Sequence, residues 1–370
     1  MGVDPTARQR GPTHKGGRGV DSDASLIDEV YQRLHRTGPE FQGYLSNHGP
    51  MAAEAMVRHG HGDQVQHWLD DYVRRLEPFP RPVSPIGADW QHALGDVRRV
   101  ADWTVQFTTD LQERTWRVVL NEWWPRLLPG IAAGATHGVI RVGHAVRTLL
   151  VDGETPARIE ELGHGLAYWA ARWLPVSAPS RGWDIGAGSR ALGEALTDIP
   201  LVASPTGGIR EWVGRMNAVP GWEAAVTTVH IPQGPDAARD WLADLVQGSV
   251  ARYLTHGHGE PIMLVHSVTA PNAVWRTLPA LDRRWWRESV VAAWVAVAAL
   301  TAIYAPPMPA EDSLLGTPWV AGADTAFARA VEHGDEHVIK FADTAIEVFG
   351  RTGDVRALAA VDRAARLISP

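Results

Sequence analysis

From about residue 25 onward, apolar residues recur at spacings of three and four, in segments rich in Arg, Ala, Leu and Glu. This spacing places apolar side chains on one face of a helix, whereas the period-2 alternation of strands is nearly absent. The only strand-like stretch is 225–231. The pattern therefore predicts an all-α protein. Helices are expected at about 26–36, 50–59, 63–76, 97–112, 115–127, 130–150, 157–173, 189–197, 207–217, 236–255, 261–281, 284–304, 323–333, 336–349 and 354–368.

Residues 290–304 carry no charge and follow a basic, Trp-rich segment at 283–287. The run is shorter than a membrane-spanning helix, and the chain has no second run of this kind. We therefore expect the buried central helix of a large helical bundle, and no membrane partner. The 17 tryptophans would fill a large core or line an aromatic pocket, and the sequence leaves both interpretations open.

Residues 1–24 are polar, Gly-rich and without an apolar core, which predicts a disordered tail and no signal peptide. Residues 25–370 are expected to form one large all-α domain, because 45% of the 370 residues are apolar and can bury an extensive core. Two loops rich in Gly, Pro and Ser, at about 175–188 and 305–322, are long enough to cover a site. Surface excursions are the simpler interpretation of both loops.

Charge and cysteine content narrow the function classes. The net charge is −7, the pI is about 6.1 and the arginines are scattered, so nucleic acid is not an expected partner. Without cysteine, a metal ion must be held by histidine, carboxylate or a modified side chain, and a reducing cytoplasm is the expected location. The chain also lacks Gly-x-Gly-x-x-Gly, a phosphate loop and Gly-x-Ser-x-Gly, so no flavin- or nicotinamide-binding fold is expected.

Lys340 is the only lysine outside the amino-terminal tail, in a chain with 33 arginines and 2 lysines. An amine can lose its proton when it is buried and can then act as a base, as a Schiff-base nucleophile, or as a carbamate that resembles a carboxylate. His337 lies three residues earlier, on the same face of a predicted helix that Asp335 can cap. The alternative is a lysine that extends toward solvent beside a satisfied histidine, and this segment alone does not decide between them.

Pro50 suits the first turn of a helix, which places His48, two residues earlier, just before that helix. Its neighbour Asn47 is one of only four asparagines in the chain. We expect the Asn47 amide to orient the His48 ring by a hydrogen bond, as residues around metal ligands often do. The alternative is a helix cap with an incidental histidine.

His137 and His144 lie two helical turns apart and therefore share one face. They cannot both reach one ion easily, so His137 is the candidate ligand and His144 a packed or supporting residue. The small residues Gly134, Gly138 and Gly143 would let another backbone come close, as at a crowded helix interface.

His266 precedes Thr269 and Pro271 in a strongly apolar segment. Proline disfavours helical geometry in the residue before it, which predicts a break or kink that frees backbone groups near His266 and Thr269.

His164 follows Glu161 in a Glu-x-x-His pattern of the di-iron kind, but such a site needs a second copy that the chain lacks. The remaining candidates lie in polar or Gly-rich surroundings and are expected at the surface. These are His35, His59, His61, His67, His92, His256 and His258.

Five segments together resemble the questin oxidase-like family, over about residues 26–366. They are Leu-Ser-Asn-His-Gly-Pro-Met at 45–51, Trp-Trp-Pro-Arg-Leu-Leu-Pro-Gly-Ile at 123–131, Thr-His-Gly-Val-Ile-Arg at 136–141, His-Ser-Val-Thr-Ala-Pro at 266–271 and Glu-His-Val-Ile-Lys at 336–340.

This resemblance implies an oxygenase of secondary metabolism that acts on polycyclic aromatic polyketides such as anthraquinones, by Baeyer-Villiger-like insertion or ring cleavage. It also implies a non-haem iron held by histidines and a carboxylated lysine. Carried over by position, the ligands would be His48, His137, His266, His337 and Lys340, with Thr269 near the open coordination position. Asn47 and His144, taken from their sequence positions, are the further candidate site residues.

The leading hypothesis is therefore an oxygenase that uses Fe(II), or another divalent metal ion, and dioxygen on a small aromatic ketone or quinol, with NADPH as a candidate reductant. One alternative is an all-α carrier that holds an aromatic metabolite in a Trp-lined pocket without catalysis. A di-iron or haem protein on a helical scaffold is the third.

Overall fold

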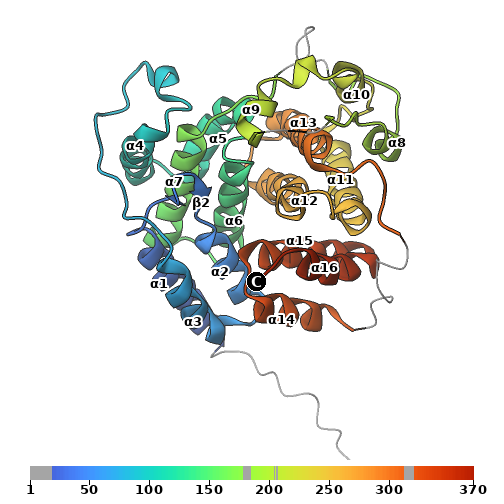
Figure 1. Cartoon of the computed structure of the whole chain (residues 1–370). Coiled ribbons are helices and arrows are strands. Elements are labelled where there is room, and N and C mark those ends of the chain that lie inside the picture. Colours follow the sequence, from blue (N-terminus) through green and yellow to red (C-terminus); the bar gives the residue numbers. More distant parts are fainter. Residues whose placement is uncertain (1–18, 178–184, 204, 206, 312–320) are drawn as a thin grey trace, which may run out of the picture.

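The computed structural model describes residues 19–177, 185–203, 205, 207–311 and 321–370. These residues form sixteen α-helices, six short 3-10 helices and one two-stranded sheet, so the prediction of an all-α bundle is confirmed (Figure 1).

The α-helices are α1 (Gly19–Leu34), α2 (Gly49–Arg58), α3 (Gly62–Val73), α4 (Val100–Glu113), α5 (Trp116–Leu127), α6 (His137–Val151), α7 (Pro156–Ala171), α8 (Leu192–Thr197), α9 (Ile209–Val213), α10 (Trp222–Thr227), α11 (Pro235–His256), α12 (Pro261–Thr277), α13 (Trp286–Tyr304), α14 (Ala323–His333), α15 (Glu336–Thr352) and α16 (Arg356–Leu367). The 3-10 helices are η1 (Trp90–Ala93), η2 (Val97–Arg99), η3 (Leu128–Gly130), η4 (Met216–Ala218), η5 (Leu278–Ala280) and η6 (Arg283–Trp285). The strands are β1 (Glu40–Phe41) and β2 (Leu45–Ser46), which pair antiparallel.

Helix α12 lies at the centre of the packing. It contacts α6, α11, α13 and α15, while α6 in turn packs against α7 and α2. The carboxy-terminal helices α14, α15 and α16 lie together below α12 in the view of Figure 1, and α15 packs against α12. Segments that are far apart in the sequence, the starts of α2, α6 and α15 and the middle of α12, are therefore brought into one region.

Helix α13 is the buried central helix that the uncharged run predicts. Among the described residues it is the one helix that is long and apolar enough to cross a membrane, counted from Arg283 to Tyr304. Of its apolar window, 89% is buried inside the protein. Such burial is typical of the core helix of a helical bundle.

Local interactions determine where α15 and α6 begin, and the first residues of both helices include a histidine of the site. Asp335 caps α15, because its Oδ1 accepts hydrogen bonds from the backbone N–H groups of His337 (2.8 Å) and Val338 (3.3 Å). Before α6, Ala135 and Thr136 adopt positive φ angles of 56° and 70°, so the chain turns sharply and α6 can begin only at His137. The prediction of one helix over 130–150 is wrong for this reason.

Other boundaries also differ from the predictions. Helix α1 begins at Gly19, so the expected tail 1–24 is too long, and residues 1–18 lie outside the described residues. The helix expected at 207–217 is divided into α9 and η4. Helix α12 runs continuously through Pro271, although such a proline removes one backbone donor and crowds the preceding turn. The packing of α12 against α6, α11, α13 and α15 offsets this cost. The predicted break in that segment is wrong.

The strand-like stretch 225–231 is not a strand. Its first residues belong to α10, which ends at Thr227, and afterwards Val229 and His230 make only isolated bridges to Arg190 and Ala187. The real sheet, β1 with β2, is a hairpin whose turn contains Gln42 and Gly43 at positive φ. Two-residue strands leave no alternation for a sequence pattern to reveal.

Candidate metal centre

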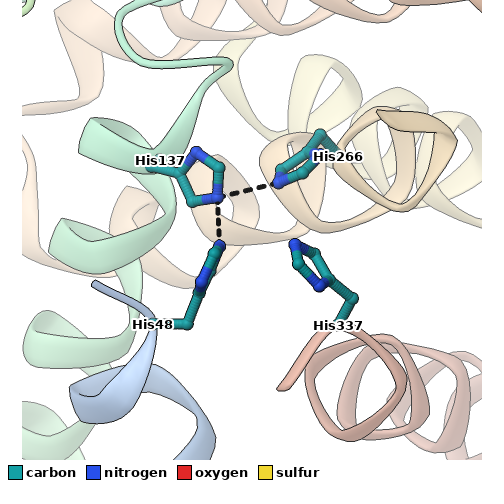
Figure 2. A group of neighbouring side chains, drawn as sticks. All are labelled: His48, His137, His266 and His337. Carbon is teal, nitrogen blue, oxygen red and sulfur yellow. Dashed lines mark hydrogen bonds between the residues drawn. The ribbon is translucent and has the colours of Figure 1, made fainter. Parts of the chain in front are cut away.

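Four histidines from four different helices meet in the interior. His48 is the residue before α2, His137 begins α6, His266 lies within α12 and His337 is the second residue of α15. All four are buried, and one ring nitrogen of each lies within 4.8 Å of the others. Figure 2 shows the rings pointing toward a common centre. The structure thus brings together all four histidines that were predicted as ligands.

Three of the Nε2 atoms face one another. The Nε2 of His137 lies 2.5 Å from that of His48 and 2.9 Å from that of His266 (Figure 2). The ring of His337 lies edge-on to that of His48, with centroids 4.5 Å apart. Two facing lone pairs would repel each other, so these nitrogens must share either a proton in a hydrogen bond or a common cation.

The His137 ring is held in one tautomer. Its Nδ1 donates a hydrogen bond to the carbonyl of Gly134, which can only accept, so Nε2 carries the lone pair that points at the centre. The turn at Ala135 and Thr136 is what places this carbonyl under the ring. Fixing the tautomer through the second ring nitrogen is the usual arrangement for a metal-binding histidine.

His48 is held from two sides. Its backbone N–H donates to the hydroxyl of Tyr72 at 2.6 Å, and its Nδ1 lies 3.5 Å from Oε1 of Glu336. Glu336 is buried and accepts a hydrogen bond of 3.0 Å from Arg75. A buried carboxylate beside Nδ1 favours a proton there, which leaves Nε2 free to bind a cation.

The donor set fits a metal ion. The single lone pair on Nε2 of His137 faces the Nε2 atoms of both His48 and His266, and it can accept a full hydrogen bond from only one of them. A divalent ion bound by the facing nitrogens would satisfy all three rings.

Burial keeps the imidazoles neutral. It lowers the pKa values of His48, His137 and His266 well below the ordinary value, and the positive charge of Lys340 lowers all three further. Neutral rings are the form that binds metal, because protonation removes the lone pair. The site therefore stays ready for a cation at neutral pH.

Lys340 lies one turn after His337 on α15 and is completely buried. Its Nζ has no hydrogen-bond partner among the described residues. Burial lowers the pKa of Lys340 to about 7, against the opposing effect of Glu336 and Asp335. A large share of this amine is therefore neutral at pH 7, as the nucleophilic and carbamate interpretations both require.

A cavity of about 750 Å³ opens onto the four histidines. Its other walls are mostly apolar and include Phe41, Tyr44, Trp173 and Tyr304. This volume lies within the usual range of small-molecule sites, roughly 300–1,000 Å³. Trp173 is the only tryptophan among the described residues that lines the cavity, so most tryptophans serve the core and the expectation of a Trp-lined pocket holds for one residue only.

The two long loops that could have covered the site, 175–188 and 305–322, do not line the cavity with any of their described residues. Residues 178–184 and 312–320 of these loops lie outside the described residues. The segment 208–210 at the start of α9 lines it instead.

Asn47 does not orient the His48 ring. Its amide nitrogen donates to the Gly38 carbonyl at 3.1 Å, and its Oδ1 accepts from the backbone N–H of Gly49 at 2.9 Å. Asn47 therefore shapes the backbone before α2, and the predicted contact with the ring is wrong because backbone groups already occupy both ends of the amide.

Thr269 and His144 also have partners away from the four histidines. The Thr269 hydroxyl donates to the carbonyl of Val265 at 3.1 Å, one turn earlier in α12, and Thr269 does not line the cavity. The Nδ1 of His144 lies 2.8 Å from Glu54, in a separate buried group with Asp343. His144 is thus a packed residue and not a ligand beside His137.

The structure adds residues that the sequence patterns did not indicate. Glu336 and Arg75 form the charged pair beside His48, and Gly134 supplies the carbonyl under His137. Glu336 directly precedes the candidate ligand His337. This neighbouring carboxylate was the one feature of the sequence that could have indicated a role for Glu336. Arg75 and Gly134 carry no such signal, because tertiary packing alone brings them to the site.

A carboxylate-bridged di-iron centre finds little support. Both oxygens of Glu161 are hydrogen-bonded to Arg141, at 2.6 and 2.8 Å, and one also to His35. Such a carboxylate is not free to bridge two iron ions.

Fold and site together define this chain as an all-α protein with a buried histidine cluster that could hold a metal ion. No protein-family model matches the chain, and a comparison with curated proteins finds no match.

Proposed function

We propose that this protein is an oxygenase that binds a divalent metal ion, most suitably Fe(II), through His48, His137, His266 and His337. The observation that carries the proposal is the convergence of four buried imidazoles from distant parts of the chain on a cavity of about 750 Å³. Imidazole ligands with one anionic oxygen donor suit Fe(II), Mn(II) or Zn(II).

Lys340 would supply that anionic donor as a carbamate. Its amine is buried, unpartnered among the described residues and has a pKa near 7, which are the conditions for reaction with carbon dioxide. The ligands that the resemblance to the questin oxidase-like family implies, namely the four histidines and Lys340, are also the residues gathered at or beside this centre. This coincidence supports the assignment.

The substrate would be a polycyclic aromatic ketone or quinone. The cavity has the size for such a molecule, and Trp173 and Phe41 offer flat apolar faces to its rings. The cavity walls would limit water near the reacting carbons, while the Glu336–Arg75 pair would hold His48 in place. When bound, the ion would supply the position at which dioxygen is activated.

Metal analysis tests the first step. Protein purified without added metal should contain close to one equivalent, and His48→Ala and His337→Ala should each weaken binding at least tenfold, as is typical when metal-site residues are lost. His92→Ala changes an exposed histidine and is the matched control. Unchanged metal content in both site variants would contradict the proposal.

Oxygen consumption tests the reaction. Monooxygenation uses one dioxygen and two electrons per inserted oxygen atom and releases water, so it requires a reductant such as NADPH. Ring cleavage by a dioxygenase places both oxygen atoms in the product and requires none. Dioxygen uptake with an anthraquinone substrate, measured with and without NADPH, separates the two. A metal-free protein that binds the anthraquinone and never consumes dioxygen would instead be a carrier.

A further inference from the structure

A chain of hydrogen bonds runs from the cavity wall to an ion pair. Ser46 is the last residue of β2, lines the cavity and is 6% exposed. Its Oγ lies 2.6 Å from the hydroxyl oxygen of Tyr168 on α7, which in turn lies 3.0 Å from Oε1 of Glu40 in β1. Glu40 is paired with Arg172, whose Nε donates to Oε1 at 2.5 Å.

The ion pair fixes the direction of each bond in this chain. Both oxygens of Glu40 accept from the Arg172 guanidinium, in the two-pronged geometry of an ionised carboxylate. A carboxylate only accepts, so Tyr168 donates its single proton to Glu40. Burial raises the pKa of Tyr168, so the hydroxyl keeps this proton. The Tyr168 oxygen can then only accept from Ser46, and Ser46 must be the donor.

Ser46 is therefore an acceptor toward the cavity. A serine hydroxyl has one proton and two lone pairs, and the Ser46 proton points at Tyr168. Any group in the cavity that reaches Oγ consequently meets lone pairs alone. Ser46 carries the one buried hydroxyl among the described residues that line the cavity, since Tyr304 is half-buried and Tyr44 is 73% exposed.

This acceptor belongs to the same wall as the metal centre. Ser46 is two residues before His48. The Tyr168 hydroxyl packs against Gly134, where an added Cβ would lie 2.9 Å from the hydroxyl oxygen. Gly134 also supplies the carbonyl that holds the ring of His137. A group bound by Ser46 is thus held on the side of the cavity where the histidines lie.

We propose that Ser46 is a specificity-determining residue that accepts a hydrogen bond from a hydroxyl group of the substrate. The inference rests on the proposed function and narrows its substrate class to aromatic ketones or quinones that carry a hydroxyl donor. An ether oxygen in the same place would turn its lone pairs toward those of Ser46. A site built to bond a hydroxyl discriminates against an analogue without one, because its own polar group is left unpaired. Tyr168 is a positioning residue, since it holds the serine proton away from the cavity.

Binding of two matched compounds tests the inference. An anthraquinone with a hydroxymethyl group at the β position has a neutral hydroxyl that is too far from the ring carbonyls to bond to them. Its methyl ether has the same oxygen without the proton. Each compound is titrated into the full chain as purified, without dioxygen so that no turnover occurs, and quenching of tryptophan fluorescence gives the affinity. The wild type should bind the alcohol about fivefold more tightly than the ether.

Tyr168→Phe is the most informative variant. It removes the acceptor of the Ser46 proton, so Ser46 can donate to the ether oxygen and the preference should fall below about twofold. Ser46→Ala should lose the preference as well. The matched control is Tyr31→Phe, which removes another buried tyrosine hydroxyl, 3.2 Å from Thr148 Oγ1 and outside the cavity lining, and should keep the full preference. The two affinities are compared within each variant, so a partial loss of folded protein leaves their ratio unchanged.

The outcomes separate this inference from the proposed function. A preference for the alcohol that survives in Tyr168→Phe and Ser46→Ala would overturn the role of Ser46 and leave the proposed function standing. Equal binding of the two compounds to the wild type would do the same. Failure of the wild type to bind either compound would overturn the substrate class of the proposed function, and this inference with it.

Discussion

Arg147 on α6 and Asp343 on α15 form a buried ion pair with a nitrogen–oxygen distance of 3.0 Å. The same two helices carry His137 and His337 at their beginnings. Asp343 also accepts a hydrogen bond of 2.7 Å from Arg276 on α12.

Glu54 on α2 completes this network through Arg147, with an Nε–oxygen distance of 2.9 Å. Every helix that positions a histidine of the metal centre thus also contributes a charged residue to one buried network. The network fixes how the four helices lie relative to one another.

Asp343→Asn should destabilise the protein strongly. It removes the negative charge between Arg147 and Arg276, and breaking a buried ion pair by removing one partner typically costs about 3–5 kcal/mol. Urea unfolding followed by tryptophan fluorescence measures the change. Arg98→Met, which breaks the exposed pair with Asp96, should leave the free energy of unfolding nearly unchanged, because solvent screens such a pair. Equal and small effects of the two substitutions would show that the buried network contributes little to stability.

The metal-free protein should lose stability as the pH falls from about 7 to 5. The pKa values of His48, His137 and His266 are lowered by burial, so below about pH 6.5 the unfolded chain binds protons that the native state does not. Each such histidine contributes a slope of at most about 1.4 kcal/mol per pH unit. His35, whose pKa is raised by Glu160 and Glu161 against the effect of burial, contributes in the opposite direction but is a single group.

Chemical unfolding at several pH values measures this dependence. His266→Leu should flatten the curve between pH 5 and 6.5, and His92→Leu, at an exposed position, should leave it unchanged. A metal-free protein whose stability rises toward pH 5 would contradict the assignment of neutral buried histidines.

Gly143→Ala should weaken metal binding from a distance. Gly143 lets α6 pack tightly against α12, since an added Cβ would lie 2.7 Å from Cα and 2.9 Å from the carbonyl oxygen of Ala273. The two helices would have to separate, and with them His137 and His266. Gly350→Ala, in an open part of α15, is the matched control and should stabilise the protein by about 0.5–1 kcal/mol. Metal affinity measured for both variants checks the prediction, which fails if the two bind alike.

Much of the fold could be predicted because helical periodicity is a local property of the chain. The uncharged run at 290–304 predicted the buried helix α13, and the small residues around His137 predicted a close helix contact that Gly143 makes. The break before α6 could not be predicted in this way, since it depends on positive φ angles at Ala135 and Thr136, residues without a special preference for that conformation.

For the site, the residue types could be predicted but not their partners. Buried histidines in apolar segments stood out, and so did a singular lysine. Asn47 was assigned to the wrong partner, because the sequence Asn-His is the same whether the amide bonds to the histidine ring or to the backbone. Conversely, His35 was expected at the surface and no role was expected for Arg75, yet the packing of α1 on α7 and of α3 on α2 gives both of them buried partners.

Lys340 offers the sharpest test, because metal binding and stability should respond in opposite directions. Lys340→Arg keeps a positive charge that cannot form a carbamate, so metal content and turnover should fall as far as in Lys340→Ala. Lys340→Glu, which supplies an anionic oxygen on a shorter stem, should retain part of the metal.

Lys340→Met should also lose the metal, yet it should stabilise the metal-free protein. Burial lowers the pKa of Lys340 from 10.5 to about 7, so at pH 7 or below the buried charge costs roughly 4–5 kcal/mol. The cost shrinks as the pH rises from 7 toward 10.5, because the native state then releases its proton before the unfolded state does. Methionine fills similar space without the charge, so urea unfolding at pH 7 should require more denaturant for Lys340→Met than for the metal-free wild type. If Lys340→Arg retains full metal content and turnover, Lys340 is not a ligand, and the histidines alone must hold the ion.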